Sequence, residues 1–269
     1  MYPYALFLDV TLYDIMLVIG VVAAFAVFLL YAKKTELNAR LQILVLISAL
    51  VGVSLGFVAA GLAQSIYFYI ESGKFEWRGM TFYGGLLGGA AFFLATYFLV
   101  GYLTFRKSET PKLYLEYAMR IFSIVICSVV IAHAIGRIGC LTAGCCHGKT
   151  FADKRPGTLP ILHIATDGTF LYTDYAVPIP LYEMLFLSGL FALLSWRALK
   201  RKGDALPLYM LIYGVWRFGI EYARADDRGE TFIKFLTPSQ LTAVLMILGG
   251  VALIVVYYKV LKKYEQKAE

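Results

Sequence analysis

Charged side chains stand inside apolar segments of this sequence, where they are costly unless they have a partner or a function. Arg217 and Glu221 are four residues apart, and Arg224 follows seven residues after Arg217. At this spacing the side chains share one face of a helix, so Arg217 and Glu221 can form an ion pair. Two interpretations follow: a structural ion pair between helices, or a site for a charged ligand.

Other ionisable residues fall near the ends of neighbouring apolar segments. Arg137 ends one of them, with His133 one turn earlier, and Glu183 lies at the start of the next. Arginines whose positive charge is only partly neutralised by nearby carboxylates bind phosphate well, because the planar guanidinium pairs with oxyanions. These residues together favour a ligand site over a purely structural role. At the outer leaflet of a membrane, the obvious phosphate is a phospholipid head group.

The composition indicates the elements that must position these residues. Of the 269 residues, 60% are hydrophobic and 16% are charged, whereas soluble domains have about 25% charged residues. A transmembrane helix needs about 20 mainly apolar residues. The segments that qualify are 15–32, 41–70, 79–105, 113–136, 181–199, 205–222 and 235–258. We therefore predict an all-α polytopic membrane protein with seven transmembrane helices, forming a single domain over residues 1–269.

The distribution of basic residues predicts the orientation of these helices. Fourteen Lys and Arg residues lie in the short segments 33–40, 105–113, 197–204 and 259–269, and nine lie in the longer segments of the opposite side. Since basic residues concentrate in cytoplasmic loops, we expect the N-terminus outside and the C-terminus in the cytoplasm. The long connection at 137–180 then forms a loop or cap on the outer side. The net charge of +7 reflects this topology, so we predict a membrane environment and no nucleic-acid partner.

A glycine-rich string that includes Gly84 and Gly85 opens the third apolar segment. Small residues four apart let helices pack closely. Glycines at a helix start also let backbone N–H groups approach an anion. Spacing alone favours helix packing, and anion binding remains the alternative.

Cysteines gather just after Arg137. Cys140, Cys145, Cys146 and His147 have the spacing C-x4-C-C-H, which fits no familiar zinc motif. We therefore predict no metal and no cofactor. A disulfide from Cys140 to Cys145 or Cys146 is one alternative in an oxidising compartment. A thiol activated by nearby Arg and His residues is the other.

Several strings together resemble the prolipoprotein diacylglyceryl transferase family, integral membrane enzymes that begin bacterial lipoprotein maturation. The strings are Gly79-Met-Thr-Phe-Tyr-Gly-Gly-Leu-Leu-Gly88, Gly136-Arg-Ile-Gly-Cys-Leu-Thr-Ala-Gly-Cys145, Val177-Pro-Ile-Pro-Leu-Tyr-Glu183 and Tyr213-Gly-Val-Trp-Arg-Phe-Gly-Ile-Glu-Tyr-Ala-Arg224, with Gln240 near the start of the last helix. The resemblance extends from about residue 10 to residue 260.

The resemblance implies transfer of the diacylglyceryl group of phosphatidylglycerol to a cysteine thiol in the lipobox of a prolipoprotein. A thioether forms and glycerol phosphate leaves. It places the protein in the bacterial inner membrane, with its site facing the periplasm. Arg137 and Arg217 would hold the phosphate, and Glu221 would orient Arg217. The remaining residues implied in substrate binding are Tyr182, Glu183, Gly136, Cys140, Gly144, Cys145, Tyr213, Arg224, Gln240, Gly84 and Gly85.

The sequence departs from the family pattern at positions where the family has side chains that can transfer protons or that carry amides. Tyr83 replaces a histidine, Cys140 and Ala143 replace two asparagines, and Cys145 replaces a glutamate. A phenol with a pKa of about 10 is a poor base near neutral pH, so we predict that His133 or His147 serves instead. The alternatives are a different acceptor for the same lipid donor, a non-catalytic lipid-binding or transport protein, and a thiol-redox protein.

Overall fold

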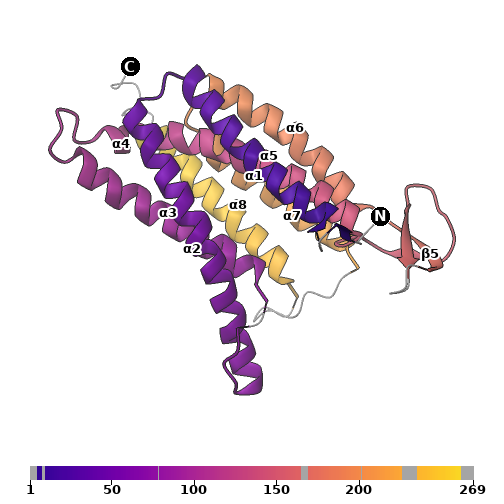
Figure 1. Cartoon of the computed structure of the whole chain (residues 1–269). Helices are drawn as coiled ribbons and strands as arrows, with labels where there is room; N and C mark the ends of the chain where they lie inside the picture. Colours follow the sequence, from indigo (N-terminus) through magenta and orange to yellow (C-terminus); the bar gives the residue numbers. More distant parts are fainter. Residues whose placement is uncertain are drawn as a thin grey trace. The chain divides into compact units, whose positions relative to one another are not determined.

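The computed structural model describes residues 5–7, 10–77, 79–164, 169–200, 202–225 and 235–261, which are mostly helical (Figure 1). Within these residues, the helices long and apolar enough to cross a membrane are α1 (Leu12–Lys34), α2 (Ala39–Ser72), α3 (Phe82–Phe105), α5 (Ala118–Ala143), α6 (Ile179–Leu199) and α8 (Pro238–Val256). A polytopic, mainly helical membrane protein was predicted from composition, and the structure confirms it.

The predicted sixth span is a shorter helix than the others. It corresponds to α7 (Ala205–Ile220), which has 16 residues and continues as the 3-10 turn η1 (Glu221–Ala223). Sixteen residues rise by about 24 Å, less than the hydrocarbon thickness of about 30 Å. Six helices in the described ranges therefore qualify as spans by length and composition. The count of seven and the orientation of the termini stay predictions.

The chain forms two compact units, and the smaller one covers Glu36–Ala118. It consists of α2, α3 and the short α4 (Leu113–Glu116). Thr81 caps α3, since its hydroxyl accepts a hydrogen bond from the Gly84 N–H at 3.2 Å. In the second half of α3, the Tyr97 hydroxyl donates to the Tyr114 backbone oxygen at 2.7 Å.

Glycines bring α2 and α3 into close contact. A Cβ built on Gly84 would lie 2.6 Å from the Ala63 Cβ, and one built on Gly88 would lie 2.3 Å from the Ala59 Cβ. Gly85 faces the same helix, with the Ala60 Cβ 3.3 Å from its own Cβ position. The predicted packing role of these glycines is therefore observed, and anion binding at Gly84 and Gly85 stays a prediction.

Adding one methyl group at Gly88 should separate α2 from α3. We expect Gly88→Ala to cost about 1–3 kcal/mol, as overpacking does in other tight interiors, and to lower the apparent melting temperature in detergent. Gly189→Ala is the matched control, because nothing lies within 4 Å of a Cβ at this helical position. The control should be neutral or stabilising by up to about 1 kcal/mol. Equal melting temperatures for the two variants would contradict the packing role of Gly88.

The larger unit comprises Met1–Thr35 and Met119–Glu269. Helix α5 supplies much of its interior, and its apolar face packs with α6 and α7 around Val130, Leu187 and Leu194, which are buried. Cys127 lies in this core with no exposed surface, as expected for a small buried hydrophobe. A Cβ on Gly20 of α1 would lie 3.2 Å from the Ala132 backbone oxygen, so α1 also approaches α5 closely.

The connection after α5 differs from the prediction in where it begins and in containing a sheet. Helix α5 continues to Ala143, because residues 137–143 contain no proline and Gly144, with φ of +66°, then ends the helix. The loop expected from residue 137 therefore begins after residue 143. Beyond it, β3 (Thr150–Phe151), β5 (Phe170–Ala176) and β4 (Leu159–Ile164) form an antiparallel sheet in that order. Figure 1 shows β5 beyond the ends of α5 and α6, which belong to the same unit.

This sheet was not anticipated by the all-α prediction. The aromatic and branched residues of Phe170–Ala176 favour a strand, but the prolines and glycines around them read as a loop. A second, two-stranded sheet of β1 (Ala5–Phe7) and β2 (Val10–Thr11) precedes α1. Both sheets lie outside the helices, so the mainly helical class holds.

An ion pair ties the end of α6 to the start of α7. Asp204 is almost fully buried and accepts hydrogen bonds from Arg197 and from Tyr258, the latter at 2.8 Å. Burial raises the pKa of Asp204, but the bonds from Arg197 and Tyr258 outweigh it and hold that pKa below its ordinary value. The carboxylate therefore stabilises the fold at neutral pH, and this contribution is lost as the pH falls through its lowered pKa.

Asp204→Asn should remove that stabilisation, about 1–3 kcal/mol for hydrogen bonds to a charged group. We expect a lower melting temperature at pH 7, with the difference from wild type shrinking below about pH 4. Asp153→Asn, at an exposed position, is the control and should change little. A difference that stays constant down to acidic pH would contradict the charge-based account.

Candidate functional site

Glu183 of α6 is the centre of a buried polar cluster. Its side chain has no exposed surface. The Arg137 Nη2 of α5 donates to Glu183 Oε1 at 3.0 Å, and Arg137 Nε lies 3.0 Å from Oε2. The Tyr213 hydroxyl of α7 donates to the same Oε1 at 2.8 Å. One carboxylate thus joins three helices, which sequence order alone did not indicate.

His133 belongs to this cluster. It lies one turn before Arg137 on α5, as predicted, and its Nε2 is 3.8 Å from Glu183 Oε1. Its ring meets the Tyr213 ring edge-on, with the centroids 5.3 Å apart. His133 retains 22% of its side-chain exposure, so it is the most accessible ionisable group of the cluster around Glu183.

Arg217 forms the second polar cluster. Its Nη2 lies 3.1 Å from Glu221 Oε2, the predicted i,i+4 ion pair, and donates to the Ser239 hydroxyl at 2.7 Å. The Thr237 hydroxyl donates to Glu221 Oε1 at 3.0 Å. Arg217 Nη1 is buried without a hydrogen-bond partner among the described residues. Buried donors are seldom left unpaired, so this one is available to a ligand.

Ser239 and Thr237 belong to this polar cluster but were not predicted from the sequence. Thr237 begins α8 with a capping box, in which its hydroxyl accepts from the Gln240 N–H and its own N–H donates to Gln240 Oε1 at 3.1 Å. The string Thr237-Pro-Ser-Gln240 carries the recognised capping pattern, which was the available signal. Gln240, expected to bind substrate, is buried and uses Oε1 in this cap.

The loop after α5 brings Arg224 to the cysteines. Gly148 and Arg224 form an isolated backbone bridge, and a Cβ on Gly148 would lie 2.6 Å from the Ala223 oxygen, so this close approach requires glycine. Arg137 Nη1 lies 3.8 Å from the Cys140 sulfur. Hydrogen bonds from Cys140 and Cys145, and to a lesser extent the Arg224 guanidinium, lower the pKa of the Cys146 thiol. These contacts connect the cysteines to two of the predicted arginines.

Other residues predicted for the site lie apart from the two buried clusters, or they stabilise the loop and the helix end. The Tyr182 hydroxyl donates to the Gly157 oxygen at 3.3 Å, so this side chain contacts the cap. Gly144 ends α5, and a Cβ on Gly136 would meet nothing within 4 Å. The His147 Nδ1 contacts the Gly148 oxygen at 2.9 Å. The Tyr83 side chain lies outside the described residues, and its role stays a prediction.

Removing the Tyr213 hydroxyl tests the Glu183 centre. We expect Tyr213→Phe to destabilise the protein by about 1–3 kcal/mol, since the buried carboxylate loses a donor, and to lower the melting temperature. Tyr209→Phe is the matched control, because the Tyr209 ring stacks on Tyr213 and loses the same atom while leaving the bond to Glu183 intact. Equal destabilisation in both variants would argue against a specific role for Tyr213.

Fold and site define a multi-pass membrane protein in which Arg137 of α5 and Arg217 of α7 each have a carboxylate partner. Arg217 Nη1 has no hydrogen-bond partner among the described residues. The sequence pattern of the prolipoprotein diacylglyceryl transferase family matches residues 3–256. The chain belongs to this family.

Its relatives include curated proteins of several bacteria. A phosphatidylglycerol–prolipoprotein diacylglyceryl transferase of Clostridium tetani is 29% identical over 246 residues, covering 89% of this chain and 90% of the relative. A protein of the same name from Dehalococcoides mccartyi is 26% identical over 255 residues, covering 90% and 87%. One from Staphylococcus aureus is 26% identical over 258 residues, covering 92% and 85%. Near full-length coverage on both sides shows that the similarity is not confined to one segment.

Proposed function

We propose that this protein transfers the diacylglyceryl group of phosphatidylglycerol to the lipobox cysteine of a prolipoprotein, the first step of lipoprotein lipidation. Family membership over residues 3–256 supports the reaction. The assignment to this site rests on one observation: Arg217 Nη1 is buried and has no hydrogen-bond partner among the described residues. A phosphate oxygen satisfies such a donor.

In this reaction the acceptor thiolate attacks the glyceryl carbon that bears the phosphate ester. The carbon–sulfur bond forms as the carbon–oxygen bond breaks, and glycerol phosphate leaves with the electron pair. Negative charge builds up on the leaving phosphate, where Arg217 offers its open Nη1. Ser239 and Glu221 hold the other terminal nitrogen of Arg217 in place. Donors fixed before the reaction stabilise developing charge most effectively in a site from which water is excluded.

The remaining residues are assigned supporting roles. Arg137 is held by Glu183, so we assign it to the rim of the phosphate site, beside the cysteine loop. Arg224 would neutralise charge at the same place. His133 and His147 are the predicted proton acceptors for the thiol, and unchanged transfer in both His133→Ala and His147→Ala would exclude them from that role.

The site is proposed to face the periplasm from the bacterial inner membrane. The excess of Lys and Arg in the short segments supports a cytoplasmic position for those segments. Arg137, Glu183, Arg217 and the sheet at 150–176 then belong to the opposite side. Cysteine-specific labelling of intact cells with a membrane-impermeant reagent at single cysteines introduced into residues 150–176 would test this. Protection of all of these positions would contradict the orientation.

Direct assay of the purified protein tests the reaction. The full chain in detergent is incubated with phosphatidylglycerol carrying labelled acyl chains and a lipobox peptide, and mass spectrometry seeks a diacylglyceryl adduct on the peptide cysteine. The same peptide with serine in place of cysteine is the control. Phosphatidylglycerol consumed without a peptide adduct would indicate a different acceptor. Lipid binding without turnover would indicate a non-catalytic lipid-binding protein.

A further inference from the structure

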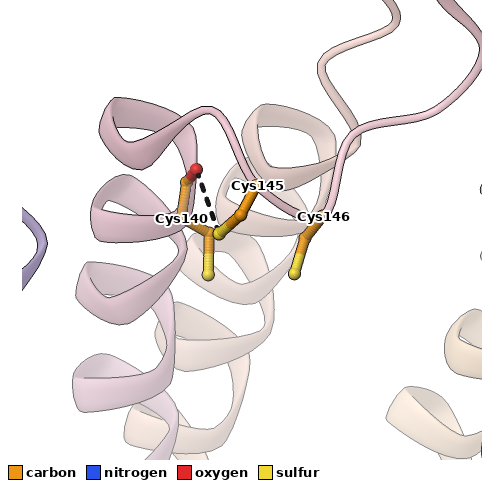
Figure 2. A group of neighbouring side chains, drawn as sticks. All are labelled: Cys140, Cys145 and Cys146. Carbon is orange, nitrogen blue, oxygen red and sulfur yellow. Dashed lines mark hydrogen bonds between the residues drawn. The ribbon is translucent and has the colours of Figure 1, made fainter. Parts of the chain in front are cut away.

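Three cysteine sulfurs converge at the end of α5. The Sγ atoms of Cys140, Cys145 and Cys146 all lie within 4.8 Å of one another, and none of the three residues is in a disulfide. Figure 2 shows the sulfurs of Cys140 and Cys145 side by side, with that of Cys146 facing them from the loop. Three thiols at this separation form a candidate site for a thiophilic metal ion.

The backbone of the loop makes this convergence possible. Successive side chains on an extended chain point to opposite sides, which would separate the adjacent Cys145 and Cys146. Cys146 instead has a φ of +60°, a left-handed conformation that non-glycine residues rarely adopt. The turn is closed by the Cys145 N–H, which donates to the Cys140 oxygen at 3.2 Å. A strained residue held in this way is typical of functional sites.

Two arginines border the cysteines. Arg137 Nη1 lies 3.8 Å from the Cys140 sulfur, and the Arg224 backbone pairs with Gly148, two residues after Cys146. Their positive charges favour a cluster of thiolates, which with Zn²⁺ would carry a net charge of about −1 by ordinary valence. The cysteines therefore border the arginines assigned to phosphate, where the acceptor thiol must arrive if the proposed transferase function is correct.

We propose that Cys140, Cys145 and Cys146 bind Zn²⁺ and leave a fourth position open for the acceptor thiol. The inference rests on the proposed function for the identity of that fourth ligand. A site with four protein ligands is structural, whereas one with three and an open position is catalytic. Among the described residues, no further His, Asp or Glu joins the three cysteines in this group. The sequence spacing alone had predicted no metal, because it did not reveal how the loop folds back.

The geometry needs little adjustment for zinc. Tetrahedral zinc with bonds of about 2.3 Å places its sulfur ligands about 3.8 Å apart. The observed limit of 4.8 Å is therefore within about 1 Å of a bound arrangement, a shift that side-chain rotation can supply. Cys145 is exposed, so the open side of the ion would be reached from outside the helices.

Zinc at this place would activate the acceptor without the histidine that Tyr83 replaces. A thiol that coordinates Zn²⁺ is deprotonated, so its proton passes to water and neither His133 nor His147 is needed as the acceptor. The bound sulfur attacks the glyceryl carbon of phosphatidylglycerol, forming the carbon–sulfur bond. The carbon–oxygen bond breaks, its electron pair stays on the phosphate oxygen, and the leaving glycerol phosphate takes up a proton from water. Nothing is oxidised or reduced, and zinc is retained.

Metal binding is tested on the full-length protein purified under reducing conditions. We expect about one Zn²⁺ per chain, and Co²⁺ in its place should show thiolate-to-metal charge-transfer absorption. Cys140→Ser and Cys146→Ser should each weaken Zn²⁺ binding by at least about tenfold. Cys127→Ala, which removes a buried thiol of the core, is the matched control and should bind as wild type does. Equal binding in all four proteins, or a stable disulfide among the three cysteines that excludes the metal, would overturn the proposal.

The acceptor position is tested with the Co²⁺-loaded protein and the lipobox peptide, without lipid. The cysteine peptide should intensify the charge-transfer absorption as a fourth sulfur binds, and the serine peptide should not. No change with either peptide would overturn the open-site proposal. Full transferase activity in metal-free protein would overturn a catalytic role for zinc while leaving the transferase function intact. A spectral response without transfer would instead refute the transferase function.

Discussion

Replacing Arg217 with alanine is expected to lower the rate of diacylglyceryl transfer by about a hundredfold or more. Loss of a single preorganised donor to a developing anion has this effect in other enzymes, about 10²–10³ in kcat. Arg217 is placed to act in this way because Nη2 is fixed by Ser239 and Glu221 while Nη1 is unpaired among the described residues. The rate is measured by mass spectrometry of the peptide adduct.

The alanine variant also leaves the buried Glu221 without its counterion, so a loss of folding must be separated from a loss of chemistry. Arg217→Lys serves this purpose, because an ammonium keeps the charge but lacks the planar pair of terminal donors. We expect its melting temperature to stay near that of wild type while kcat falls by about tenfold or more. Arg106→Ala, at an exposed position at the end of α3, is the control and should transfer normally.

Kinetic parameters then distinguish an enzyme from a passive lipid binder. If Arg217 acts on the leaving phosphate, kcat and kcat/KM should fall together, since the interaction strengthens only in the transition state. If it contributes only to lipid affinity, KM should rise with kcat unchanged. Wild-type kcat in Arg217→Lys and Arg217→Ala would remove this residue from the chemistry.

Sequence spacing predicted the parts of the site that lie within one helix. The ion pair of Arg217 with Glu221 and the position of His133 one turn from Arg137 follow from helical periodicity. The partners of Glu183 were not predictable in this way. Its bonds to Arg137 and Tyr213 join α6 to α5 and α7, and periodicity within one helix does not specify which residue of another helix lies opposite.

The convergence of the three cysteines could not be predicted from the sequence for a different reason. It depends on left-handed backbone at Gly144 and at Cys146. The first could be anticipated, because glycine adopts this conformation freely, but the second could not, because cysteine seldom does. The sheet of β3, β4 and β5 was missed for a related reason, since β3 has only two residues and the pairing of the strands depends on contacts between segments distant in sequence.

The largest effect on stability is expected at Glu183. Glu183→Gln removes the only carboxylate within reach of Arg137 among the described residues, so a buried guanidinium loses its counterion. Breaking a buried pair from one side typically costs about 3–5 kcal/mol. We therefore expect a marked fall in melting temperature and in the yield of folded protein in detergent. Glu109→Gln, at an exposed position, is the control and should leave both unchanged.

A double-mutant cycle separates the pair from its surroundings. Arg137→Gln with Glu183→Gln leaves two neutral amides where two charges stood, so the double variant should be less destabilised than the sum of the single variants. Coupling of about 2 kcal/mol or more is expected for a pair this buried. Strict additivity would mean that the two charges are stabilised independently, for Glu183 chiefly by Tyr213 and His133. Arg137 would then be free to bind phosphate as fully as Arg217, and both arginines would carry the leaving group.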